Sequence, residues 1–380
     1  MTTLLQNIQA EKSERNLTVY LVGTDLEFEW EDFLTTHPES TIYHHPLWLK
    51  VIEKESGQEV LKLICTNDEN EILGILLLQE TKGIPFGLGG VSGSRRLSSL
   101  PRTPIGGPLA TDEYVAAKLI NGVINLVSEN PDKLLQIKSY ATDLDKYARF
   151  LYKHFWREIY IKEIPPYPDE IRYGSSRNHS AIKRAVNKAL RSGVRYRLAE
   201  TEDDLRQWYN LYLDTMRFHT SPARSFKFFI DLWKYLRPKG FMNLLLAELE
   251  EGKNKATIAG NVLFYYNGTV TYAFNGSSRH HFEYRSNDLL HMQAIVDAQK
   301  DGYREYNLGE VARDHSGLAA YKKKWGSKVM RLYHYYYPNP PQLEKGPLDV
   351  EIVSGLKNKI WRRLPLCITA KIGKMVYKKL

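Results

Sequence analysis

The chain has 380 residues, of which 43% are hydrophobic, and 53 Lys+Arg against 44 Asp+Glu give a net charge of +9. This length exceeds what one hydrophobic core usually organises, so we expect two domains, and the apolar content excludes disorder as the main state. Cys65 and Cys367 are far apart and lack CxxC or Cys/His spacing. That pattern excludes a disulfide framework and a zinc-finger type of site, and it indicates a reducing compartment.

The first residues are charged and contain no apolar block of signal-peptide size, and nowhere do eighteen apolar residues run together. We therefore expect a cytoplasmic protein. The positive charge is concentrated in residues 171–200 and 351–380, each with eight basic residues and one acidic residue. Since the rest of the chain leans acidic, anionic partners are expected at these two places.

In the first half, β-rich runs separated by a polar turn predict a hairpin, and apolar residues at three- and four-residue spacing predict helices. The predicted elements are a strand 17–22, a helix that opens at His45, strands 61–66 and 72–80, a Gly- and Pro-rich loop 83–108, a helix 114–130 and a strand 134–139. A loop of that length inside a compact domain is typically functional.

Three prolines between Ile164 and Pro168 mark a boundary, because neither a helix nor a strand continues through them. The patterns beyond it predict helices 176–192, 202–217 and 225–235, strands 241–248, 256–266 and 269–274, helix 286–301, strand 305–308, helix 318–325 and strand 329–337. Asn267-Gly268 between two of the strands is a strong hairpin signal. The predicted division is a domain 1–165, a domain 166–338 that holds the catalytic site, and a basic amphipathic tail 339–380.

Arg177, Arg184 and Lys188 share one face of the predicted 176–192 helix, and apolar residues share the opposite face. No acidic residue occurs between Arg177 and Arg197. Unrelieved repulsion of this kind costs stability, which favours contact with a polyanionic substrate. A solvated helix face is the alternative interpretation.

A second constellation begins where the strand 305–308 ends. Gly309-Glu310 follows the strand, and after a loop come Gly317-Leu318, Tyr321-Lys322 and Trp325-Gly326. This order resembles the Fem family, the peptidoglycan-bridge aminoacyltransferases and related acyltransferases. Further matches at 43–48, 100–109, 184–185, 191–194, 275–277, 287–294 and 297–303 extend the resemblance over about residues 40–337.

The resemblance implies an α/β (α+β) fold of two tandem GNAT-like domains, each a mixed, mostly antiparallel sheet flanked by helices. It also implies transfer of an acyl or aminoacyl group to an amine. Lys322 matches the family's lysine after an aromatic residue, whose implied role is to stabilise negative charge on the donor or the tetrahedral intermediate. One preorganised cation contributes about 3 kcal/mol to such an oxyanion. A solvated basic run over 322–324 is the alternative.

Two other residues complete the predicted catalytic set. Glu310 is the candidate for orienting or deprotonating the amine, and Tyr272 ends a hairpin strand at a place where GNAT-like sheets splay. No metal site is predicted. The remaining candidates are expected to bind substrate. They are Arg177, Arg184, Lys188, Arg217, Arg224, Asn275, Asn287, His291 and Trp325.

The sequence departs from GNAT proteins that use acyl-CoA. Their Arg/Gln-x-x-Gly-x-Gly/Ala loop, which cradles pyrophosphate at a helix N-terminus, has no counterpart in residues 275–286. The long helical arm of some Fem enzymes is also absent, because residues 198–240 suffice for only two ordinary helices. No cofactor is expected, and the donor is left open between aminoacyl-tRNA and an acyl thioester.

Basic residues alternate with Trp361 and aliphatic residues along 351–380, and Pro365 divides this segment in two. The composition is typical of an interfacial helix that lies on anionic lipid. A basic helix docked on its own protein, or a disordered end, is the alternative.

These patterns predict an acyltransferase that acts on an amine of a lipid-linked, peptidoglycan-type envelope precursor at the cytoplasmic membrane face. The expected partners are that precursor, aminoacyl-tRNA and, through residues 351–380, an anionic membrane surface, but not DNA. One alternative is an N-acyltransferase that uses CoA or a carrier protein on a sugar amine or small amine. A non-catalytic nucleic-acid-binding module is the other, with affinity that falls steeply with salt.

Overall fold

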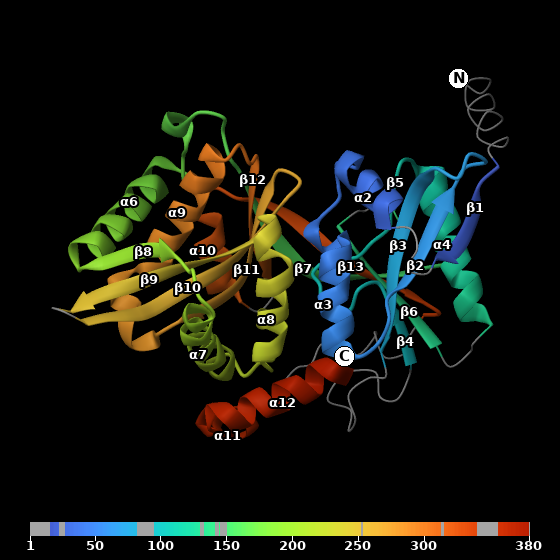
Figure 1. The fold of residues 1–380 in the computed structure, drawn as a ribbon. Coiled ribbons are helices and arrows are strands. Elements are labelled where there is room, and N and C mark those ends of the chain that lie inside the picture. Colours follow the sequence, from blue (N-terminus) through green and yellow to red (C-terminus); the bar gives the residue numbers. More distant parts are fainter. Residues whose placement is uncertain are drawn as a thin grey trace. The chain divides into compact units, whose positions relative to one another are not determined.

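The computed structural model describes residues 16–22, 27–81, 95–129, 133–140, 144, 150–251, 254–312, 315–339 and 356–379 (Figure 1). Packing divides the described residues into two compact units. The first takes its residues from Met1–Trp156 and Leu332–Asp349, and the second from Arg157–Arg331 and Val350–Lys378. The predicted limits at 165 and 338 differ from this division. The first boundary between the units falls inside the strand 152–163, which ends just before the prolines. The second falls inside the last strand, 328–337, most of which belongs to the first unit.

The first unit is a mixed sheet with strand order β1-β2-β3-β4-β6-β13, and β5 pairs with β3. Buried residues of α4, among them Leu119 and Val123, pack against buried residues of β2, β3, β4 and β6. The elements are β1 (Thr18–Val22), α2 (Glu27–Thr36), α3 (Pro46–Ser56), β2 (Leu61–Thr66), β3 (Ile72–Thr81), β4 (Arg95–Ser98), β5 (Leu109–Ala110), α4 (Glu113–Ser128), β6 (Lys133–Ser139) and β13 (Lys328–Tyr337).

The strands and helices predicted for the first half are confirmed, although α2 and β5 were missed, and one loop needs correction. The loop predicted over 83–108 contains β4, which pairs in parallel with β6. Two adjacent arginines, Arg95 and Arg96, open this short strand and hide its alternation, although Leu97 is buried as in an ordinary strand.

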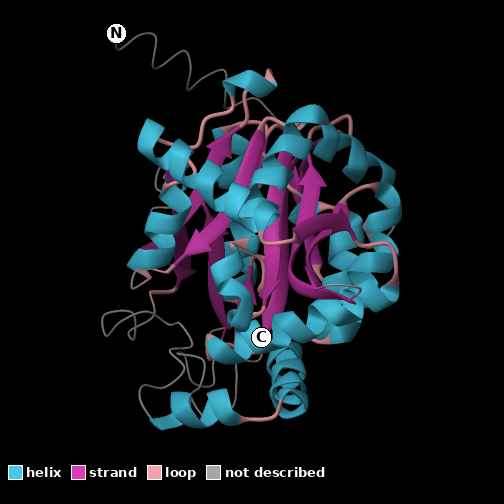
Figure 2. Ribbon diagram, turned by 90° about the vertical axis from the view of Figure 1, so that its left-hand side faces the viewer, coloured by secondary structure: helices cyan, strands magenta, loops and turns pink. Residues whose placement is uncertain are grey.

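The second unit is a six-stranded sheet in the order β7-β12-β11-β10-β9-β8. Helices lie on both faces of the strands (Figure 2). In this unit α6 and α9 cover one side of the sheet and α7 and α8 the other (Figure 1). The elements are β7 (Tyr152–Glu163), α6 (Ser176–Arg191), β8 (Val194–Leu198), α7 (Glu202–Phe218), α8 (Phe226–Tyr235), β9 (Met242–Glu251), β10 (Asn254–Tyr266), β11 (Thr269–Ser277), α9 (Ser286–Lys300), β12 (Glu305–Val311), α10 (Ser316–Lys323), α11 (Leu356–Arg363) and α12 (Leu366–Lys379).

Alternation along β9 explains why helices cover both faces. Leu245 and Leu249 join the buried cluster that contains residues of α6 and α9. Leu246 points to the other face, where its side chain and that of Trp208 from α7 crowd Gly260 of β10. Because successive side chains of a strand point to opposite faces, a strand with two apolar faces needs helices on both. The helices and strands predicted for the second half are confirmed, but β7 and β8 were missed.

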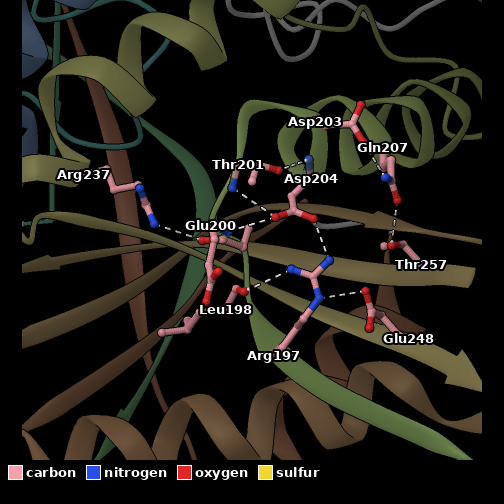
Figure 3. A network of polar contacts seen from close by, with 11 residues as sticks. Arg197, Leu198, Glu200, Thr201, Asp203, Asp204, Gln207, Arg237, Glu248 and Thr257 are labelled. Atoms are coloured by element: carbon pink, nitrogen blue, oxygen red, sulfur yellow. Dashed lines mark hydrogen bonds and ion pairs between the residues drawn. The ribbon is translucent and has the colours of Figure 1, made fainter. Parts of the chain in front are cut away.

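A network of charged groups fixes the start of α7 to β8 and β9 (Figure 3). Asp204 accepts hydrogen bonds from the backbone N–H groups of Glu200 and Thr201 at 2.9 and 3.0 Å and from Arg197 Nη2 at 2.6 Å. Arg197 Nε in turn donates to Glu248 Oε1 at 2.8 Å. The Arg197 guanidinium and these backbone donors hold the pKa of Asp204 well below its usual range. The network is therefore a charged helix cap that stabilises the second unit.

None of the helices among the described residues combines the length and apolar character needed to cross a membrane.

Candidate active site

Strands β11 and β12 separate soon after they begin. They pair in parallel only where Thr269–Thr271 face Glu305–Asn307. Beyond this point β11 continues its pairing with β10, whereas β12 continues with β7 after an irregularity between Asn307 and Glu310. We call the place where the two strands part the fork. A continued register would place Tyr272 opposite Leu308 and Ala273 opposite Gly309, and the two strands do not pair there.

The irregularity in β12 places one extra residue opposite β7, since Asn307 faces Ile161 and Glu310 faces Ile159. Gly309 lies inside it with a φ of +80°, a conformation that glycine adopts without strain. Because side chains alternate along a strand, one extra residue moves those that follow to the opposite face. The bulge therefore decides to which side Glu310 points.

Lys322, on α10, places its ammonium group at the fork. Its Nζ donates to the backbone oxygen of Glu310 at 3.1 Å, and a Cβ built on Gly309 would lie 3.5 Å from both this Nζ and the backbone oxygen of Tyr272. The side chain is only 5% exposed. Burial lowers the pKa of Lys322 from 10.5 to about 8, with Glu310 opposing the shift and Arg157 adding to it. At neutral pH the group is thus a buried cation.

The Glu310 carboxylate is near enough to Lys322 to oppose the lowering of its pKa. One oxygen, Oε1, lies 3.3 Å from Arg157 Nη1. The other, Oε2, is buried and accepts no hydrogen bond from the described part of the chain. A buried carboxylate oxygen of this kind is suited to take a hydrogen bond or a proton from an incoming amine.

Arg157 is a site residue that the sequence analysis missed. It lies on β7, which was not predicted as a strand, because charged and apolar residues do not alternate along it: Arg157 and Glu158 are adjacent, and an apolar run follows them. The only signal of a strand is its richness in aromatic and isoleucine residues.

Aromatic rings enclose His291 beneath the fork. The ring of Tyr272 lies 4.7 Å from that of His291 and the ring of Trp325 lies 5.5 Å from it, while the Tyr306 hydroxyl is 2.9 Å from His291 Nδ1. Burial first, and then Lys322 and Lys324, lower the pKa of His291 to about 3. The imidazole is therefore neutral. Its contacts hold Tyr272 and Trp325 in place, and Trp325 itself is fully buried.

Asn275 and Asn287, which were predicted as substrate-binding residues, contact each other. Asn275 Nδ2 donates to Asn287 Oδ1 at 3.2 Å and to Asn261 Oδ1 at 2.9 Å. Ser277 Oγ lies 3.0 Å from Oδ1 of both Asn275 and Asn287. Asn261 is fully buried, and its Nδ2 has no hydrogen-bond partner among the described residues.

A β-bulge brings Asn261 and Asn275 together. Register in the hairpin is regular from Tyr266, opposite Thr269, to Leu263, opposite Tyr272. It then shifts by one residue between Leu263 and Val262, so that Asn261 faces Asn275 rather than Phe274. Bulges of this type often re-aim side chains next to functional sites. Asn261 and Ser277 were missed because the shift is not visible in the residue pattern.

The comparisons with known proteins bear on this arrangement. Residues 176–323 match the family model of the acetyltransferase (GNAT) domain. This segment is a GNAT-type acyltransferase domain. The predicted enzyme class is confirmed, and the alternative of a non-catalytic nucleic-acid-binding module is wrong.

Solved structures extend the likeness in fold to both units. FemX is 15% identical with a TM-score of 0.64, covering 84% of this chain and 98% of that chain. A C-terminal domain assigned to lysylphosphatidylglycerol synthetase from Agrobacterium fabrum is 13% identical with a TM-score of 0.51. The match covers 76% of this chain and 87% of that domain. A tandem GNAT protein of the clavulanic acid pathway is 11% identical with a TM-score of 0.50, covering 86% and 99%. The predicted Fem-like, tandem GNAT fold is confirmed, whereas comparison with curated proteins finds no match.

The loop that leads into α9 in this GNAT domain differs from a phosphate cradle. Residues 278–286 contain no glycine. The loop forms a 3₁₀ turn, Arg279–Tyr284, in which the N–H groups of His281 and Arg285 donate to Ser278 and Phe282 of the same loop. Among the described residues, no group of three or more His, Cys, Asp or Glu side chains is arranged to hold a metal ion.

The three predicted basic residues of α6 lie apart from the fork contacts. Arg177, Arg184 and Lys188 are exposed, and within the described ranges none of them forms an ion pair. The opposite face of α6 packs inward through Ile182 and Val186. The helix thus presents a cationic surface.

Arg217, in the last turn of α7, and Arg224, which follows the helix, contact the C-terminal helices. Arg217 pairs with Asp214 and donates to the backbone oxygen of Leu364 at 3.1 Å. Arg224 is buried, 4.2 Å from the ring of Phe228 and 4.7 Å from that of Tyr377. The contacts that the structure shows for both guanidinium groups are therefore with the protein itself.

Proposed function

We propose that the protein transfers an aminoacyl or acyl group to an amine of a lipid-linked, peptidoglycan-type envelope precursor at the cytoplasmic membrane face. The observation that carries the proposal is the pair at the fork. The buried ammonium of Lys322 donates to the backbone oxygen of Glu310, and the Glu310 carboxylate acts on the pKa of this ammonium. The second oxygen of that carboxylate accepts no hydrogen bond from the described residues.

The chemistry follows from these two charges. The amine of the acceptor attacks the carbonyl carbon of the donor, a C–N bond forms, and the carbonyl oxygen takes up negative charge beside the Lys322 ammonium. Glu310 accepts the proton that the nitrogen must lose. The intermediate then collapses, the bond from carbon to the donor's oxygen or sulfur breaks, and the leaving group takes the proton. Arg157 holds Glu310 through Oε1 and leaves Oε2 for the amine.

The loop before α9 favours an aminoacyl-tRNA donor over acyl-CoA. It has no glycine that would let the backbone approach a pyrophosphate closely. The phosphates of an RNA donor would instead be contacted by exposed cations on α6, Arg184 and Lys188.

Two likenesses support an acceptor in the cell envelope. The motif order resembles the Fem family of peptidoglycan-bridge aminoacyltransferases. The fold is similar to a domain assigned to lysylphosphatidylglycerol synthetase, whose name describes the joining of lysine to a membrane phospholipid.

The test offers each donor to the purified protein with an amine-bearing, lipid-linked precursor. Mass spectrometry of the precursor is expected to show an amide-linked increment with aminoacyl-tRNA and none with uncharged tRNA. Transfer from acyl-CoA at an equal rate would contradict the choice of donor. No increment from either donor on any amine would contradict the proposed function.

A further inference from the structure

The C-terminal helices α11 and α12 are docked on the second unit by one face of α12 (Figure 1). Thr369, Gly373 and Tyr377 recur every four residues along that face. A Cβ on Gly373 would lie 2.0 Å from the backbone oxygen of Ala223, so only glycine permits this approach. Tyr377 lies over the guanidinium of Arg224 at 4.7 Å. This face of α12 therefore packs against the second unit of the protein.

α11 is held by the same region. Arg362 Nε donates to the backbone oxygen of Phe218 at 2.9 Å, and its guanidinium lies 4.9 Å from the Phe218 ring. Arg279, from the loop before α9, lies 3.6 Å from the same ring. Positive charge from the tail and from the acyltransferase domain thus gathers around one side chain.

The opposite face of α12 is exposed and combines two kinds of side chain. Ile368 and Met375, seven residues apart and therefore on one side of the helix, are 41% and 59% exposed. Ile360 of α11 is 55% exposed. No acidic residue occurs in 356–379. Exposed lysines lie alongside the apolar side chains. They are Lys371, Lys374 and Lys378.

We propose that this outer face of α11 and α12 is a preformed platform for an anionic phospholipid bilayer. A helix docked only for stability would bury its large apolar residues and expose polar ones. Here apolar side chains flank lysines on the exposed side, which is the arrangement that places a helix in the interface of a negatively charged leaflet. Charge complementarity and the exposed apolar stripe both select that partner.

The platform adds a membrane-binding surface to the proposed function. It rests on the proposed function only for the reason why binding to lipid would be useful. A lipid-linked acceptor stays in the membrane, so an enzyme held at the bilayer meets it by diffusion in two dimensions. Binding to lipid can be measured with no donor or acceptor present, which separates a failure of this inference from a failure of the proposed function.

The test is sedimentation of the full chain with vesicles of phosphatidylglycerol and phosphatidylcholine, compared with phosphatidylcholine alone. We expect binding only to the anionic vesicles. Replacing Lys371, Lys374 and Lys378 by glutamine is expected to weaken it about 100-fold. The double variant Ile368→Ser, Met375→Ser is expected to weaken the binding that remains at high salt.

The matched control removes three charges from the other basic zone, through Arg184→Gln, Lys188→Gln and Arg191→Gln on α6. It is expected to bind the anionic vesicles as the unaltered protein does, and an equal loss in this control would overturn the assignment to α12. Circular dichroism is expected to show no gain of helix when vesicles are added. A large gain would overturn the preformed platform, as would equal sedimentation of the three-lysine variant and the unaltered protein.

Discussion

Replacing Lys322 by methionine is expected to remove activity and at the same time to stabilise the fold. Methionine keeps the length of the side chain but has no charge to desolvate. Burial lowers the pKa of Lys322 from 10.5 to about 8, which corresponds to a cost of about 3 kcal/mol for holding the charged form in the folded protein. Since neutral pH lies below both values, the whole cost applies there, and Lys322→Met is expected to raise the free energy of unfolding by up to about 3 kcal/mol.

The same charge is what the reaction uses. Losing one preorganised cation at a developing oxyanion is expected to lower kcat about 100- to 1,000-fold. In the unaltered protein, kcat/KM is expected to fall as pH rises through about 8, where Lys322 loses its proton. Stability is expected to rise over the same range and up to about pH 10.5, because the unfolded chain still holds the proton that the folded chain has lost.

Urea unfolding followed by tryptophan fluorescence measures the stability, and single-turnover transfer measures the chemistry. Lys322→Arg, whose guanidinium stays charged, is expected to move the descending limb of the pH profile upward. Lys323→Met removes the exposed neighbouring charge and is expected to change neither quantity appreciably. Full activity of Lys322→Met, or a loss of several kcal/mol in its stability, would refute this reasoning.

Three further outcomes are expected. Glu310→Gln keeps the shape of the side chain but cannot accept the proton, so kcat is expected to fall about 100-fold or more with little change in unfolding. Asp204→Asn breaks the charged cap of α7 and is expected to cost about 2 kcal/mol of stability at neutral pH; in the unaltered protein the same contribution is lost as pH falls below the usual aspartate range of about 4. Arg184→Gln with Lys188→Gln is expected to reduce the salt dependence of RNA binding by about two units of the log–log slope.

Each of these outcomes can be compared with a control variant, and for each there is a result that would contradict it. For Glu310 the control is Glu305→Gln on the same strand, and unchanged kcat in Glu310→Gln would exclude it as the base. Asp203→Asn lies beside Asp204 but outside the ion pair with Arg197, so equal effects of the two would contradict the assigned network. An unchanged salt slope would remove α6 from RNA binding.

Much of this architecture was predictable from the sequence, because its signals are local. The hairpin turn Asn267-Gly268 and the apolar spacing along 202–217 and 286–301 each specify one element without reference to distant residues. The lysine that follows Tyr321 was recognised from the order of motifs in the chain. Asn275 and Asn287 were selected separately, and the structure shows them in contact.

The rest depends on non-local geometry. The bulge near Leu263 decides that Asn261 faces Asn275, and the bulge at Gly309 decides which way Glu310 points, but a bulge adds one residue without a distinctive pattern. Arg217 and Arg224 depend on distant packing in the same way. Two arginines on either side of a short loop have the composition of an anion site, and only the packing of the C-terminal helices shows what their guanidinium groups contact.

The central claim is that acyl transfer takes place at the fork of β11 and β12 through Lys322. The most direct measurement is the mass of envelope precursors extracted from cells that lack the protein and are supplied with either the unaltered chain or Lys322→Met. The account predicts a mass increment on an amine-bearing precursor with the unaltered chain and none with the variant, both proteins being folded and equally abundant. An increment of equal size with the variant would contradict it.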